Sequence, residues 1–177
     1  MINLIELDTD KSVNSAFGWR NSPTEGASTS HKGIDITLSD YNIPSVLGGT
    51  VSYVGYSNSG GNMIFVKQND GTTAKYMHMA APSTLKVGDV VSEGTILGTQ
   101  GSTGISTGDH VHFQVEKDGV PIDPETYFSS SVVVEEKESN GGIISDILGK
   151  IVTAIVILLL AVLAVYLFMK AFDIQII

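Results

Sequence analysis

The segment His110-Val111-His112-Phe113 alternates imidazole and apolar side chains. This period of two predicts a β-strand with both histidines on one face and Val111 and Phe113 packed on the other. Two imidazoles on one face are typical of a metal or catalytic site, although one such pair is equally compatible with hydrogen-bonded structural histidines. The segments around the other histidines help to separate these interpretations.

The chain has four histidines, and the other two, His31 and His78, also lie in suggestive segments. His31 and Asp35 are four residues apart, which places them on one face of a strand or a helix. The isoleucines that flank Asp35 favour a strand or the start of one. One carboxylate and two imidazoles are the ligands expected for a catalytic zinc whose fourth position stays open. Spacing alone allows either His110 or His112 as the second imidazole.

Short alternating segments broken by glycines fill most of residues 1–128. Residues 49–56 and 63–68 resemble strands, turn residues lie at 58–62, and Asn69-Asp70-Gly71 is a hairpin signal. Strands at this short, even spacing, without a convincing soluble helix, predict an all-β domain.

The balance of charges argues against some partners. The chain has 19 acidic and 10 basic residues, a net charge of -9 and a pI near 4.7. These values argue against a nucleic-acid partner and against simple electrostatic adhesion to an anionic cell wall. The chain has no cysteine and hence no disulfide, which identifies no compartment.

The histidine segments belong to a series of short motifs whose order resembles that of the LytM/lysostaphin-type zinc metalloendopeptidases, the M23 peptidases. The match covers residues 14–128, and the motifs in combination are far more specific than either histidine motif alone. The motifs are Phe17-Gly18-Trp19-Arg20, His31-x-Gly33-x-Asp35, Tyr76-Met77-His78-Met79, residues 87–94, Gly101-Ser102-Thr103-Gly104, residues 108–113 and Gly119-x-Pro121-x-Asp123-Pro124. The resemblance implies the duplicated hybrid motif fold, an antiparallel, barrel-like or two-sheet domain with an open groove across one sheet.

The same resemblance implies an activity and a site. M23 peptidases are zinc endopeptidases that hydrolyse peptide bonds in the cross-links or stem peptides of bacterial peptidoglycan. Carried onto this sequence, the zinc ligands are His31, Asp35 and His112. His78 and His110 then lie beside the zinc as proton carriers that also stabilise the oxyanion. All five polar positions are intact, which favours an active hydrolase over a non-hydrolytic peptidoglycan-binding, structural or regulatory protein with this fold.

Three features of the predicted domain leave alternatives open. Arg20 either pairs with an acid or contacts substrate. The loops at 21–30 and 102–109 are expected to border the groove and to select which peptidoglycan bond is cut. Residues 86–98 also resemble half of a biotinyl or lipoyl carrier, but the chain lacks a lysine in a carrier's hairpin context.

The composition changes after residue 128. Residues 129–142 are rich in Ser, Gly and Glu and predict a solvated linker. Residues 151–169 are apolar and without a charge, and are long enough to span a bilayer as a helix. We expect a C-terminal transmembrane helix over 143–170, with residues 151–169 as its membrane-spanning core, and a short tail over 171–177. A lipid membrane is then an expected partner.

The N-terminal residues 1–13 predict an arm, in which Ile2 and Leu4 suggest an edge strand. This start lacks the basic region, apolar run and cleavage site of a secretory signal. We therefore expect a single-pass C-terminal anchor, located either in the virion membrane or penetration device of a bacteriophage or in a bacterial cell envelope. Other virion or envelope proteins are then candidate partners.

Overall fold

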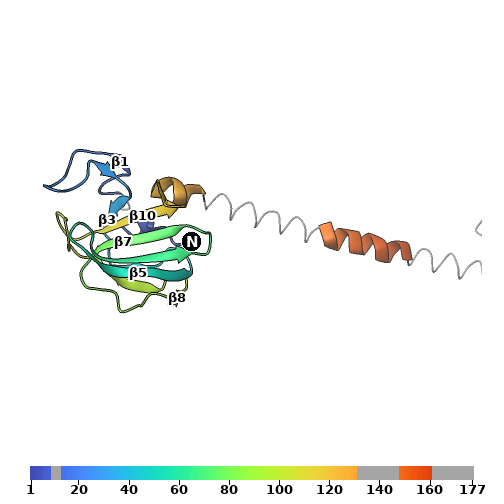
Figure 1. Cartoon of the computed structure of the whole chain (residues 1–177). Helices are drawn as coiled ribbons and strands as arrows, with labels where there is room; N and C mark the ends of the chain where they lie inside the picture. The colour runs from blue at the N-terminus through green and yellow to red at the C-terminus, as the bar shows by residue number, and fades with distance from the viewer. Residues whose placement is uncertain (9–12, 131–147, 161–177) are drawn as a thin grey trace, which may run out of the picture. The chain divides into compact units, whose positions relative to one another are not determined.

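The computed structural model describes residues 1–8, 13–130 and 148–160. Contacts divide the chain into two units, Met1–Ser131 and Val132–Ile177. The first unit carries all four histidines and is built mainly from β-strands, as the sequence predicted (Figure 1).

A seven-stranded sheet forms the body of the first unit. Its strands follow the order β11-β10-β7-β6-β5-β8, and β3 also pairs with β10. Two smaller sheets, β1-β2 and β4-β9, have two strands each. The strands are β1 (Gly18–Trp19), β2 (Ser30–His31), β3 (Ile34–Ile36), β4 (Asn42–Pro44), β5 (Gly49–Ser57), β6 (Gly61–Gln68), β7 (Thr73–Met79), β8 (Val90–Val91), β9 (Ile96–Thr99), β10 (Val111–Lys117) and β11 (Val120–Ile122).

The large sheet is open. Every strand pairing in it is antiparallel, as predicted. Within the described part of the chain, no pairing joins β8 to the strands at the other end, β3 and β11. The barrel-like part of the prediction is therefore wrong, because a barrel requires its first and last strands to pair.

One face of the large sheet carries the hydrophobic core because alternate residues of its central strands are apolar. Ile64 and Val66 of β6 are fully buried, and so are Val111 and Phe113 of β10. The alternation predicted around His112 is thus confirmed. The opposite face of β10 is left to present polar side chains.

The chain bends between His31 and Asp35. His31 ends β2, whereas Asp35 is the middle residue of β3, so the prediction of one strand through both residues is wrong. The bend lies at Gly33, where a Cβ would stand 2.3 Å from the Phe113 carbonyl oxygen and 2.9 Å from His112 Nε2. Because Gly33 has no side chain, β10 can pack directly against the bend.

The N-terminal segment forms a 3-10 helix, η1 (Leu4–Leu7), where the sequence suggested an edge strand. The Asn3 side chain accepts a hydrogen bond from the Ile5 N–H at 3.0 Å, which caps this short helix. Leu4 is fully buried in the core. The segment is therefore anchored to the domain by packing of Leu4.

A short helix over residues 124–130 was not predicted. The Asp123 side chain accepts the Glu125 N–H at 3.0 Å, and a proline follows Asp123 at the first helical position, where its missing N–H is no loss. Phe128 stacks on Phe113 with a centroid separation of 5.5 Å. The helix thus covers the core beneath β10.

The second unit is described over one helix, residues 148–160, whose side chains are exposed. Among the residues that the structure describes, no helix is both long and apolar enough to cross a membrane. The predicted span, 151–169, is described as far as residue 160. Its remainder, the predicted linker from residue 131 onward and the tail at 171–177 lie outside the described residues.

Candidate metal centre

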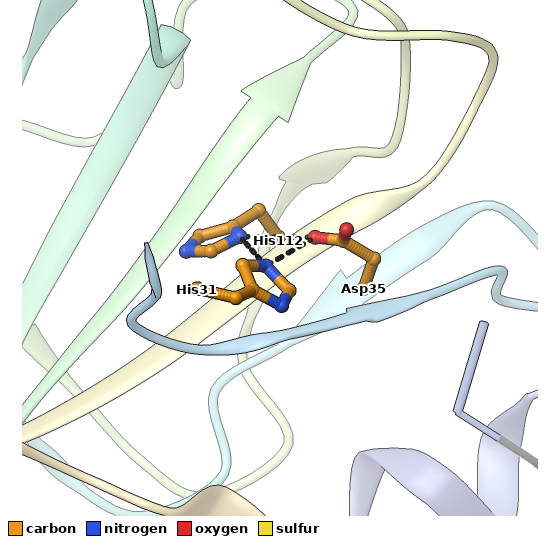
Figure 2. A group of neighbouring side chains, drawn as sticks. All are labelled: His31, Asp35 and His112. Carbon is orange, nitrogen blue, oxygen red and sulfur yellow. Dashed lines mark hydrogen bonds and ion pairs between the residues drawn. The ribbon is translucent and has the colours of Figure 1, made fainter. Parts of the chain in front are cut away.

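Three ligand-type atoms from β2, β3 and β10 converge at one point of the first unit (Figure 2). His112 Nδ1 lies 2.9 Å from both Asp35 Oδ1 and His31 Nε2. The third side of the triangle, from His31 Nε2 to Asp35 Oδ1, is 3.1 Å. The structure thus brings together the three residues that the family pattern names as ligands, in a group that could hold a metal ion.

Strand pairing delivers these three side chains. His112 and Asp35 are register partners on β10 and β3. On its other side, the Asp35 N–H donates to the Ser15 carbonyl at 3.0 Å. His31 comes from the small sheet, where it is the register partner of Gly18. The large sheet therefore positions Asp35 and His112, and the small β1-β2 sheet positions His31.

The hydrogen bonds of His31 fit a metal ligand. Its Nδ1 lies 2.8 Å from the Ala16 carbonyl oxygen, and a carbonyl only accepts, so Nδ1 carries the proton. Nε2 of the neutral ring then holds a lone pair that faces the Asp35 carboxylate and His112. Lone pairs this close favour a cation between them, so the residues present fit a bound zinc ion.

The charge states of the other two residues support this fit. Burial lowers the pKa of His112 below its ordinary value, although its hydrogen bond and ion pairing with Asp35 oppose the shift. Burial raises the pKa of Asp35, but hydrogen bonds with His112 and His31 outweigh burial and hold that pKa well below its usual range. Near neutral pH the centre therefore offers the Asp35 carboxylate and the neutral imidazole of His112.

Arg20 pairs with the Asp35 carboxylate, which is one of the two roles that the sequence left open, and it also lines both cavities beside the centre. Its Nη1 donates to Asp35 Oδ2 at 2.8 Å and also hydrogen-bonds to the Ser15 hydroxyl. Oδ2 is thereby occupied and Oδ1 faces the two histidines. Arg20 thus orients the carboxylate, as outer partners of metal ligands commonly do.

His78 and His110 lie beside the centre. The ring of His78 has its centroid 4.9 Å from that of His110 and 6.1 Å from that of His112. His110 Nε2 is 3.7 Å from Asp35 Oδ1. Burial lowers the pKa of His78 to about 4, so its imidazole is neutral near pH 7. All five predicted site residues therefore meet in one place.

Two cavities flank this cluster, with volumes of about 420 Å³ and 320 Å³. His78, His112 and Ile105 line both of them. Residues from the loops at 21–30 and 102–109 form part of both linings, as expected for loops that border a groove. The candidate metal centre therefore faces space in which a ligand can lie on either side.

The fold and the site match a known family. The family model for peptidase family M23 matches residues 29–124, more than half of the 177-residue chain. The chain belongs to peptidase family M23. The matched M23 region contains all five site residues.

Known M23-like proteins resemble parts of this chain. The catalytic domain of the antimicrobial peptidase lysostaphin from Staphylococcus simulans superposes with a TM-score of 0.58 at 31% identity, over 67% of this chain and 92% of that one. Glycyl-glycine endopeptidase ALE-1 of Staphylococcus capitis is 39% identical over 87 residues, 48% of this chain and 24% of that protein. Peptidoglycan DD-endopeptidase ShyC of Vibrio cholerae is 29% identical over 105 residues, 59% of this chain and 24% of that protein. The chain therefore spans 24% of the length of each of these two curated relatives.

A row of polar residues on the M23 sheet supports the centre and was missed from the sequence. The Gln114 side chain hydrogen-bonds to His112, and its Nε2 donates to Glu116 Oε1 at 2.6 Å. Lys75 Nζ pairs with the same oxygen at 2.6 Å. Because a carboxylate only accepts, Glu116 fixes the Gln114 amide with its oxygen toward His112. The sequence did contain a signal for this row, because Gln114 and Glu116 continue the alternation two and four residues beyond His112.

Proposed function

We propose that this M23 protein is a zinc-dependent endopeptidase that hydrolyses peptide bonds of bacterial peptidoglycan. The observation that carries the proposal is the triangle of ligand atoms from His31, Asp35 and His112 with two further imidazoles beside it. The names of two relatives, a glycyl-glycine endopeptidase and a peptidoglycan DD-endopeptidase, support the substrate class. They describe different bonds, so both cross-bridge and stem-peptide bonds are candidate substrates.

The chemistry divides between the ion and the side chains. A bound zinc ion would supply a Lewis acid that polarises the scissile carbonyl and activates a water molecule. His78 and His110 each direct Nδ1 at a backbone carbonyl, so in each neutral ring Nε2 is free to accept a proton. Each histidine can then return that proton to the leaving amine, and while protonated it donates a hydrogen bond to the oxygen that gains negative charge.

The test of this function uses the full chain and purified peptidoglycan from walls of several cross-bridge types. Each sample is incubated with and without a zinc chelator, and the released fragments are identified by mass spectrometry. We expect new amino termini that disappear with chelator and return when zinc is restored. No released fragments from any wall type, with folded and zinc-loaded protein, would overturn the enzymatic function and favour non-hydrolytic binding.

We also propose that residues 151–169 attach the protein to a lipid membrane. Two observations support this proposal. The sequence of the segment would present apolar side chains on every side of a helix, and the side chains over 148–160 are exposed. We expect the full chain to stay with the membrane pellet after alkaline carbonate extraction. A chain that is released by this treatment would contradict the proposal.

The setting that we propose is a bacteriophage particle, with a bacterial envelope as the alternative. The apolar segment follows the M23 domain, so the domain leaves the ribosome before its anchor does. Detection of the protein in purified virions by mass spectrometry is the expected result. Its absence from virions and presence in the envelope fraction of cells would favour the alternative.

A further inference from the structure

The two histidines that lie beside the candidate metal centre are both held by one loop, residues 102–109. Nδ1 of His78 is 2.8 Å from the Thr103 carbonyl oxygen, and Nδ1 of His110 is 2.8 Å from the Gly108 carbonyl oxygen. A carbonyl only accepts, so both rings carry their proton on Nδ1. This loop therefore selects the same tautomer for both histidines, with Nε2 unprotonated in each neutral ring.

The backbone of His78 is constrained where it meets this loop. His78 has a φ of 60°, a left-handed backbone conformation that residues other than glycine rarely adopt. Its N–H donates to the Gly60 carbonyl at 2.8 Å, in the turn between β5 and β6. Such strain persists where the surroundings over-determine the conformation, and it concentrates at functional sites. The loop is part of these surroundings because it binds the ring of the same residue.

Thr103 fastens the loop to both strands beside His78. Its hydroxyl donates to the Met79 carbonyl at 2.7 Å and accepts the Asn62 N–H at 3.0 Å. Met79 follows His78 directly on β7, and Asn62 is the register partner of Met79 on β6. One hydroxyl therefore fixes the carbonyl of its own residue relative to the strand that carries His78.

Two glycines allow the loop to lie this close to the strands. A Cβ at Gly61 would stand 2.3 Å from the Thr103 carbonyl oxygen, and a Cβ at Gly104 would stand 2.4 Å from the Gly61 nitrogen. Backbone therefore packs directly on backbone. At its other end the loop is closed by the His110 N–H, which donates to the Gly101 carbonyl at 3.0 Å.

We propose that the 102–109 loop orients both acid–base histidines and that Thr103 is its positioning residue. Thr103 acts through His78, whose ring it directs by the hydroxyl anchors and the carbonyl contact. The role of this loop thus extends beyond bordering the groove. The inference rests on the proposed endopeptidase function for its kinetic part, whereas the tautomer of His78 can be measured without turnover.

The kinetic test replaces Thr103 by valine in the full chain, which keeps the shape and removes the hydroxyl. We expect kcat on a soluble peptide that contains the bond cleaved in the wall to fall by about tenfold or more, a part of what acid–base catalysis supplies. KM and zinc content should stay within about twofold of the starting protein, because the groove and the three ligands are untouched. Thr103→Ser retains the hydroxyl and should restore most of kcat.

The matched control is Thr50→Val on β5, which removes an exposed hydroxyl away from the groove and should leave kcat unchanged. If Thr103→Val does not fold, Thr103→Ala takes its place. The space that alanine leaves admits water to the two backbone groups that the hydroxyl bound, so this variant can fold. We expect the same loss of kcat from it. Wild-type kcat in a folded Thr103→Val or Thr103→Ala protein would overturn the proposal. So would an equal loss of kcat in Thr50→Val.

Nitrogen NMR of the histidine rings provides the readout that does not depend on activity. In the unsubstituted chain we expect the ¹⁵N shifts of His78 and His110 to report protonated Nδ1, and in Thr103→Val we expect His78 to become a mixture of tautomers. If the unsubstituted chain cleaves no wall but shows this change, the enzymatic function fails and the positioning role stands. An unchanged His78 tautomer in Thr103→Val would overturn the positioning role.

Discussion

Asp35 and His112 stand directly opposite each other on β3 and β10, with Asp35 Oδ1 2.9 Å from His112 Nδ1. Their approach is therefore set by the register of a backbone ladder, which places two ligand atoms without a flexible loop. A slip of one residue in that register would turn His112 toward the core and break the triangle with His31. The β3–β10 pairing is thus a condition for the candidate metal centre.

The assignment of His110 and His112 predicts opposite effects on metal content. His112→Ala removes a ligand atom of the triangle, so we expect little bound zinc and no activity. His110→Ala should retain zinc and lose at least about a hundredfold in turnover, because a proton carrier is removed. Elemental analysis and peptide-release assays on both purified variants check this. An apoprotein from His110→Ala would reverse the two roles.

Gln114 should control zinc affinity through His112. Gln114→Leu removes the side chain that hydrogen-bonds to His112, and we expect the zinc Kd to rise by about 10- to 100-fold. Competition with a chromophoric chelator measures these constants.

Two lysines of the same sheet give a matched comparison for this row. Lys75→Met removes the partner of Glu116, which holds the Gln114 amide, and we expect weaker zinc binding in the same direction as Gln114→Leu. Lys67→Met changes an exposed lysine of β6 and should leave the zinc Kd unchanged. Equal zinc Kd values for the two variants would contradict a role of this polar row in zinc binding.

The bend at Gly33 should not tolerate a side chain. Gly33→Ala places a Cβ against the Phe113 carbonyl and His112 Nε2, so we expect the free energy of unfolding to fall by about 1–3 kcal/mol and zinc binding to weaken. Denaturant unfolding of the full chain measures the first effect. Gly108→Ala, where a Cβ meets nothing within 4 Å, should leave stability unchanged.

The hairpin turn between β6 and β7 should make stability depend on acid pH. Burial raises the pKa of Asp70, but hydrogen bonds from Thr72 and from the Tyr127 hydroxyl, 2.8 Å away, outweigh it, and the pKa lies below its ordinary value. A carboxyl of lowered pKa stabilises the fold above its unfolded pKa of about 4, and this contribution is lost as pH falls through the folded value.

We therefore expect Asp70→Asn to lower the free energy of unfolding at pH 7 by about 1 kcal/mol and to have a smaller effect at pH 3. Tyr127→Phe, which removes the hydroxyl donor, should show the same trend because it removes one of the bonds that lower this pKa. Urea titrations at the two pH values provide the measurement. A larger effect of Asp70→Asn at pH 3 than at pH 7 would contradict the sign.

Much of the site could be predicted because its chemistry is carried by residue types at short spacing. The alternation around His112 placed Val111 and Phe113 in the core and left both histidines on the other face, as the structure confirms. Gln114 and Glu116 continue that alternation and could have been found in the same way. The role of Thr103 could not, because it depends on contacts with Asn62 and Met79, far from it in the sequence.

The fold shows the same division. The antiparallel hairpin at Asn69-Asp70-Gly71 was predictable because turn residues there act on their immediate neighbours. The openness of the sheet and the bend at Gly33 were not, because each depends on which distant strand packs beside which.

The sequence by itself determined which groups are available to the site, namely imidazoles, a carboxylate and the alternation that sorts them from the core. Only the tertiary structure decided how these groups meet. It directs Arg20 to the outer oxygen of Asp35, and it sets the Nδ1 tautomer of His78 from a loop 25 residues further along the chain. The physical reason is that periodicity is a property of neighbouring residues, whereas ligand geometry and tautomer are set by hydrogen bonds across the fold.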